Sequence, residues 1–225
     1  MAAEMASARR SRGGNAGLEF ALLSPVLLTL FLGTIDLSNA LLAARRMEIA
    51  AGAIAEIGTT GAAQTRAMNL LTDQQAWQAT TAAFALFPEW NAASSSPNFA
   101  ITLSAVEFIP SPANCVQNCA YTATVKWSVA NELGRPTLRA CGPLSSAANT
   151  DPTSYTTLPI GNFGPTSVLV ADISYTFQPV FFSFLNIGNI QMMHSAYVSP
   201  RLGNGIGLTR TNDAAMKGVM VICPT

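Results

Sequence analysis

An apolar run near the amino terminus constrains this chain more than any other feature. Leu18 to Ile35 is 18 residues long and holds one charged side chain, Glu19, close to its beginning. As a helix it measures about 27 Å at about 1.5 Å per residue, close to the roughly 30 Å hydrocarbon thickness of a bilayer. Three basic residues come just before it: Arg9, Arg10 and Arg12. We therefore predict a membrane helix that carries the rest of the chain.

Three kinds of membrane segment compete for this run. A cleaved signal peptide has an apolar core of about 7–15 residues and then a site such as Ser38-Asn39-Ala40, but the run is longer and contains Glu19. A plain anchor explains the length of the run but not Glu19. A charge deep in a membrane helix costs about 2.5–3.5 kcal/mol, so a charged residue there indicates a function. In the third, a peptidase cuts after Gly14, which makes Asn15 the first residue and Glu19 the fifth.

The third interpretation agrees with a family resemblance. The stretch from Gly14 to Pro25 resembles the TadE-like minor pseudopilins of tight-adherence (Flp) pilus systems. The shared features are the leader arginines, the glycine, the pair Glu19-Phe20 and the proline six residues after the glutamate. A looser similarity covers residues 175–201, from Tyr-x-Phe-x-Pro-Val-Phe to Ser-Pro-Arg.

The resemblance implies a cytoplasmic leader, residues 1–14, that a prepilin peptidase removes after Gly14. It further implies a single inner-membrane helix, a periplasmic or extracellular domain, and other pseudopilins and pilus-assembly proteins as partners. Glu19 would pair with the new ammonium group of Asn15 or of a neighbour, because a carboxylate in a low dielectric needs an opposite charge. Phe20 and Pro25 would belong to the same helix-assembly segment, with Pro25 as a kink.

The helix is expected to continue beyond the membrane, so that residues 15–57 form the span and its extension. Ile49, Ala53 and Ile57 repeat every four residues, and we expect this stripe to pack on the protein's own domain, with a partner surface as the alternative. Gly58 and Gly61 would end the helix. A second helix should begin at the capping box Thr72-Asp73-Gln74-Gln75.

From residue 99 onward the apolar period changes to two, which predicts strands. Four are expected: Phe99–Phe108, Tyr121–Ala130, Val168–Phe177 and Ile190–Val198. In the second strand Tyr121, Ala123, Val125, Trp127 and Val129 should face one way. Residues 131–165 read as an irregular insertion, and the 202–225 tail holds one weak strand near Gly218–Cys223. The predicted fold is α+β: a long helix, then a pilin-like exported domain at 58–225 with a second helix and an antiparallel sheet.

All four cysteines fall in the predicted exported domain: Cys115, Cys119, Cys141 and Cys223. Their spacing does not match a zinc site, and an exported domain favours disulfides. Three connectivities are possible, and the preferred ones join Cys115 to Cys119 or to Cys141 and leave Cys223 to hold the tail.

Other function classes find little support in the sequence. Twelve basic and twelve acidic side chains give no net charge, so no nucleic-acid partner is indicated. We find no motif for a nucleophile, a metal or a phosphate, and the single histidine, His194, lies on an expected strand. No enzyme activity, cofactor or small-molecule substrate is therefore predicted. The expected function is pilus assembly, and the alternative is an unprocessed, membrane-anchored envelope module for binding or adhesion.

Overall fold

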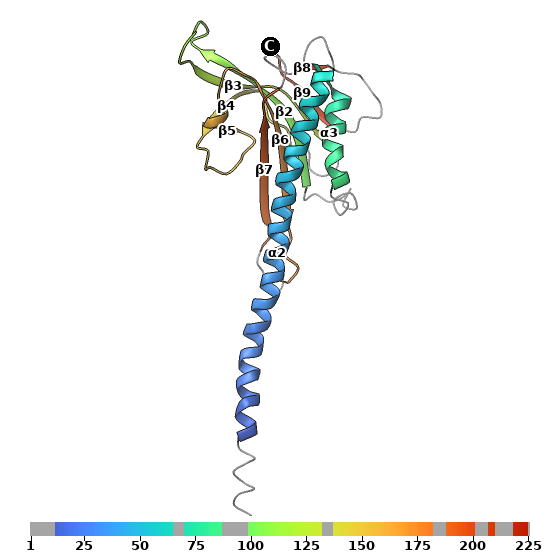
Figure 1. Cartoon of the computed structure of the whole chain (residues 1–225), viewed down its shortest axis with the longest axis vertical. Coiled ribbons are helices and arrows are strands. Elements are labelled where there is room, and N and C mark those ends of the chain that lie inside the picture. The colour runs from blue at the N-terminus through green and yellow to red at the C-terminus, as the bar shows by residue number, and fades with distance from the viewer. Residues whose placement is uncertain are drawn as a thin grey trace, which may run out of the picture. The chain divides into compact units, whose positions relative to one another are not determined.

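The computed structural model describes residues 12–64, 70–86, 99–131, 137–181, 188–200, 207–209 and 218–224. Most of the predicted leader and the glycine-rich residues 203–206 lie outside this part of the chain. The chain divides into two compact units, one of residues 1–43 with 178–189 and the other of residues 44–177 with 190–225. The α+β class predicted from the sequence is confirmed, with a long helix, a second helix and a mixed sheet (Figure 1).

The first helix, α2, runs from Arg12 to Gln64 without a break. It passes through Gly58, where the sequence predicted its end. The glycine serves close packing instead, because a Cβ at Gly58 would lie 2.5 Å from Leu169 Cδ2 and 3.3 Å from Leu103 Cδ2. Its lack of a side chain lets the helix approach the sheet closely.

The face that α2 buries after residue 44 differs from the predicted one. Ile49 and Ile57 are 65% and 42% exposed, so the expected stripe does not pack on the domain. The buried apolar side chains on this part of the helix are mostly small: Met47, Ala50, Ala51, Ile54 and Ala55. The alanines allow the helix to lie flat on the sheet, and a simple four-residue repeat of large side chains does not detect such a face.

The second helix, α3, runs from Asp73 to Leu86 and begins with the predicted capping box. The backbone N–H of Gln75 donates to Thr72 Oγ1 at 3.1 Å, and the Thr72 N–H donates to Gln75 Oε1 at 3.0 Å. These reciprocal bonds satisfy two groups at the helix start. The helix packs through alanines, Ala76, Ala79 and Ala83, into the same core as α2.

All four predicted main strands are present, as β2 (Phe99–Ser111), β3 (Ala120–Asn131), β6 (Val168–Phe177) and β7 (Ile190–Val198). They pair antiparallel in the order β3-β2-β6-β7. The predicted tail strand is β9 (Gly218–Ile222), which pairs with the second half of β3. A separate parallel pair joins β1 (Leu70–Thr72) to β8 (Gly207–Thr209).

A β-bulge makes the sheet two-sided and corrects the prediction for β3. Ala105 pairs with Trp127 but Val106 pairs with Val125, so Lys126 is an extra residue on β3. An extra residue reverses the alternation of side chains. Trp127 and Val129 therefore belong to the helix-side core, whereas Ala123 and Val125 belong to a second core on the other face.

The insertion at 131–165 is more regular than expected. Its described part contains β4 (Gly142–Ala147), β5 (Thr157–Pro159) and a 3₁₀ turn, η1 (Ile160–Asn162). β4 pairs antiparallel with β3, and β5 pairs parallel with β4. Leu144 and Leu158 supply apolar side chains to the second core. Figure 1 shows β4 and β5 on the side of the main strands away from α3.

Candidate functional site

The amino-terminal half of α2 carries the residues predicted for processing and membrane assembly. Gly14 and Asn15 lie in its first turns, and the side chains of Glu19 and Phe20 are exposed. The apolar side chains that follow are exposed too: Leu22, Leu23, Val26, Leu27, Leu28, Leu30, Phe31, Leu37, Leu41 and Leu42. An 18-residue window in this helix has a mean hydropathy of 1.9 and none of it is buried. By length and composition the helix is a candidate membrane span, and the apolar window differs from a buried core helix in that none of its residues is buried.

Hydroxyl groups within the span bond to the helix's own backbone. Thr29 Oγ1 donates to the carbonyls of Pro25 and Val26 at 2.8 and 2.9 Å. Thr34 Oγ1 donates to the Phe31 carbonyl and Ser38 Oγ to the Thr34 carbonyl, both at 2.7 Å. Polar groups satisfied in this way are compatible with a lipid environment. Pro25 lies inside the helix and does not end it.

Asp36 closes the apolar run and holds a distant segment of the chain. Its side chain is 3% exposed, and its two oxygens accept the backbone N–H groups of Val180 at 3.1 Å and Phe181 at 2.9 Å. Both partners lie in the connection between β6 and β7, and all three residues belong to the same compact unit. From the sequence, Asp36 is simply the first polar residue after the span, and nothing in its neighbourhood predicts this contact.

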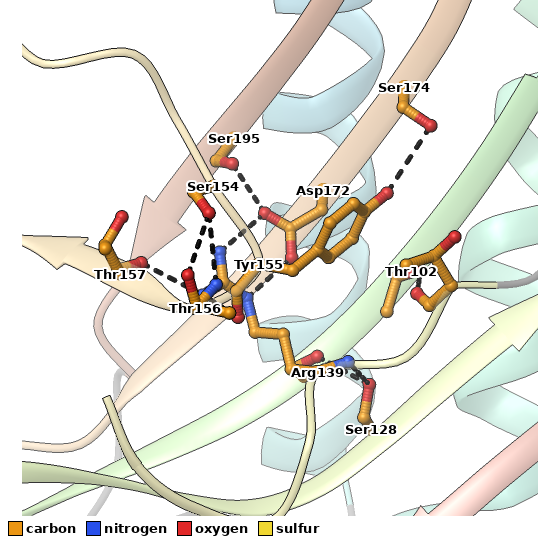
Figure 2. A network of polar contacts seen from close by, with 12 residues as sticks. Thr102, Ser128, Arg139, Ser154, Tyr155, Thr156, Thr157, Asp172, Ser174 and Ser195 are labelled. Carbon is orange, nitrogen blue, oxygen red and sulfur yellow. Dashed lines mark hydrogen bonds and ion pairs between the residues drawn. The ribbon is translucent and has the colours of Figure 1, made fainter. Parts of the chain in front are cut away.

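In the second compact unit, a buried ion pair joins the insertion to the sheet. Arg139 Nε and Nη2 donate to the two Asp172 oxygens at 2.7 and 2.8 Å, and both side chains are 0% exposed (Figure 2). Arg139 Nη1 also donates to the carbonyls of Tyr155 and Thr157 at 3.2 and 3.1 Å. Ser195 Oγ donates to Asp172 Oδ1, the oxygen that also accepts from Arg139 Nη2.

Further hydroxyl groups extend this network, among them the hydroxyl of Tyr155. The backbone N–H of Arg139 donates to Ser128 Oγ at 3.1 Å, and Ser128 Oγ lies 2.8 Å from Ser104 Oγ. The Tyr155 hydroxyl donates to Ser174 Oγ at 3.4 Å (Figure 2). Burial raises the pKa of the Tyr155 hydroxyl above its ordinary value of 10.0. The charges of Arg139 and Asp172 are paired with each other, so this arrangement is typical of a structural contact that holds the insertion on the sheet.

An open cleft of about 690 Å³ lies beside this network. Its walls come from the insertion and from the facing ends of β6 and β7: Pro152, Thr153, Tyr155, Ser174, Tyr175, Thr176, Gln191, Met192 and Met193. None of these lining residues is charged, and Thr153 Oγ1 donates to the Met193 carbonyl at 3.1 Å at the edge of the sheet.

Two carboxylates on the strands belong to separate ion pairs. Asp172 pairs with Arg139, whereas Glu107 forms a partly exposed ion pair with Lys126 at 2.7 Å. His194 is half-buried on β7 opposite Ile173. Among the residues that the structure describes, no three His, Cys, Asp or Glu side chains are grouped as a metal site would require.

The four candidate cysteines form two disulfides. Cys115 joins Cys119 across the β2–β3 turn, and Cys141 joins Cys223. This is one of the arrangements expected, and its second bridge ties the tail after β9 to the insertion before β4.

Comparison with known proteins supports the amino-terminal motif. Residues 14–56 match the family model described as TadE-like protein. The match begins at Gly14, includes Glu19 and Pro25, and extends along α2. No curated protein and no solved structure matches the chain. The predicted resemblance is therefore confirmed over this stretch, and the looser similarity at 175–201 lies outside it.

Proposed function

We propose, from the similarity of residues 14–56 to TadE-like proteins, that this chain is a minor pseudopilin-like subunit in assembly of a tight-adherence pilus. A prepilin peptidase removes residues 1–14. The apolar half of α2 then holds the protein in the inner membrane, with its amino terminus in the cytoplasm and its second unit outside. The role is assembly and not catalysis, and its partners are other pseudopilins and pilus-assembly proteins.

The exposed apolar surface of α2 is the observation that carries this proposal. Leu22, Leu27 and Phe31 are 68%, 58% and 62% exposed, and together with their neighbours they form a surface that must be covered by lipid or by other helices. The same surface serves both stages of the proposed role, because it faces lipid before assembly and neighbouring helices afterwards.

Glu19 gives this surface its specificity. It lies four residues after Asn15, about 6 Å along a helix at about 1.5 Å per residue. Cleavage after Gly14 would create an ammonium group at Asn15 within reach of this carboxylate or of a neighbouring chain's. In an apolar bundle an unpaired Glu19 is costly, so subunits that present the opposite charge are preferred.

The decisive experiment is the amino-terminal sequence of the protein isolated from membranes of cells that also produce the prepilin peptidase. We expect it to begin at Asn15. A start at Met1 would favour the alternative, an anchored binding or adhesion module that uses its exported domain, and a start near Leu41 would mean a signal peptide. Either result contradicts the proposal.

Two neighbouring glycines provide a matched control. Gly14→Val should leave the leader attached, whereas Gly17→Val should still be cut, because a Cβ at Gly17 meets nothing within 4 Å. Glu19→Gln should be cut normally, yet should recover less of the partner pseudopilins when the protein is purified from membranes. Equal recovery with Glu19→Gln would remove the charge pairing from the proposed mechanism.

A further inference from the structure

The connection between β6 and β7 is fastened to the membrane helix by a carboxylate. Asp36 accepts hydrogen bonds from two successive backbone N–H groups, those of Val180 and Phe181. Bonds from N–H groups to a charged acceptor are strong, and two of them fix the direction of the bound backbone. Pro179, next to this pair, is buried. The root of the connection is therefore held in place at one defined point on α2.

That point is the end of the apolar run. Asp36 directly follows Ile35 and is the first charged residue after Glu19. All leucines between residues 18 and 35 are described, and Leu32, one turn before Asp36, is the one among them that is not exposed. Cover on the helix therefore begins inside the apolar run and not beyond it.

The chemistry of the connection suits lipid better than water. Its sequence from Gln178 to Asn189 contains no charged residue. At its described root Val180 is 67% exposed, and Phe181 is half-buried beside it. Backbone N–H groups near lipid need partners within the protein, and Asp36 supplies two of them.

From these observations we propose that the described root of the β6–β7 connection, residues 178–181, contacts the outer headgroup boundary of the membrane that α2 crosses. Val180 faces lipid there, and Asp36 holds the segment against the helix. The inference rests on the proposed membrane insertion of α2. It adds a second lipid contact, far along the chain from the span, which would resist sliding of the helix along the membrane normal.

The test uses a fluorescent label at Val180. The four native cysteines are all paired, so Val180→Cys introduces one free thiol for a polarity-sensitive dye. The labelled full chain is placed in vesicles of phosphatidylethanolamine and phosphatidylglycerol, with or without lipids that carry a nitroxide near the top of the acyl chain. We expect a roughly twofold loss of fluorescence from the nitroxide, because interfacial segments lie about 5–10 Å into the headgroup–acyl boundary.

Two labelled positions of similar exposure separate the possible outcomes. Leu28→Cys, 58% exposed in native form, reports the span, and Ile160→Cys, 60% exposed, reports the exported domain. Quenching at positions 28 and 180 but not at 160 supports the inference. Quenching at 28 alone overturns it and leaves the membrane anchor intact, whereas no quenching at 28 contradicts the proposed insertion itself. Equal quenching at 160 would indicate general adsorption of the domain and would also overturn it.

A variant of the anchor tests the role assigned to Asp36. Asp36→Ala should reduce the quenching at position 180 while leaving that at position 28 unchanged. Unchanged quenching at 180 would show that Asp36 does not hold the segment at the membrane. A label at 180 that is shielded from an aqueous quencher, but is not reached by the lipid nitroxide, would identify a protein cover and contradict the proposal.

Discussion

Removing Arg139 should destabilise the second compact unit more than the removal of any exposed charge. The Arg139 side chain donates four hydrogen bonds, two of them to Asp172, and both members of the pair are fully buried. In Arg139→Met the Asp172 carboxylate stays buried and keeps the hydroxyl of Ser195 as a donor. Breaking a buried pair on one side typically costs about 3–5 kcal/mol, because an uncompensated charge is left inside.

This cost is large against the total stability of a domain, which is about 5–15 kcal/mol. With a urea dependence of about 2 kcal/mol per molar, a loss of about 4 kcal/mol lowers the unfolding midpoint by about 2 M. The assay is urea unfolding of the full chain in detergent with its disulfides intact, followed by tryptophan emission. Trp127 is 1% exposed and lies in the core of the same sheet, so its emission reports loss of this packing.

Two comparisons show whether the reasoning is right. The matched control is Lys126→Met, which breaks the Lys126–Glu107 pair; its side chains are 32% and 39% exposed, so we expect a loss of about 0–1 kcal/mol. Combining Arg139→Met with Asp172→Leu removes both charges and should be more stable than Arg139→Met alone. A midpoint for Arg139→Met equal to that of the control, or a double variant no better than the single one, would refute the argument.

Three further predictions concern the same domain. Gly58→Ala should destabilise by about 1–3 kcal/mol through overpacking against Leu169, whereas Gly52→Ala in the same helix has open space and should stabilise by up to about 1 kcal/mol; paired denaturant midpoints check this. A disulfide that closes a longer loop stabilises more, so loss of the Cys141–Cys223 bridge, which spans 82 residues, should cost about 4 kcal/mol. Loss of the Cys115–Cys119 bridge, which spans 4 residues, should cost about 2 kcal/mol. Denaturant midpoints of the Cys→Ser variants measure both losses. Burial raises the pKa of Tyr155 above 10.0, so the folded state favours the neutral phenol. The resulting contribution to folding stability is complete below pH 10 and is lost as the pH rises through the pKa of the folded state. Tyr155→Phe should therefore lessen the fall of stability above pH 10, and an identical fall in both proteins would contradict this.

The strands and the second helix were predictable because each depends on local sequence. Alternating apolar residues located β2, β3, β6 and β7, and the Thr72–Gln75 capping box located the start of α3. The bulge at Lys126 was not predictable, because an extra residue in one strand is defined only by its partner. The bulge places Val125 and Trp127 on opposite faces of the sheet, although apolar and polar residues alternate regularly in the sequence of β3.

The Arg139–Asp172 pair could have been found in part. Asp172 lies between Ala171 and Ile173 on a strand whose neighbouring residues are apolar, and a carboxylate in such a run must have a partner. The sequence does not identify that partner, since Arg139 lies 33 residues earlier within a stretch that is rich in turn-forming residues. Long-range pairing of this kind also explains why the insertion is more regular than its composition indicates.

The composition of α2 explains both the success and the failure of the sequence at the amino terminus. From residue 18 to residue 35 most side chains of the helix are large and apolar, and length and hydropathy are sufficient to identify it as a candidate membrane span. Beyond residue 44 the helix must approach a sheet, and the residues that permit this are Ala51, Ala55 and Gly58, whose apolar signal is weak. The large residues Ile49 and Ile57 stay exposed. Between these two parts Asp36 accepts a hydrogen bond from Val180, which lies 144 residues further along the chain in the connection between β6 and β7. One continuous helix thus meets two different surroundings, and the residue that marks the change between them is identified by its contacts and not by its neighbours in the sequence.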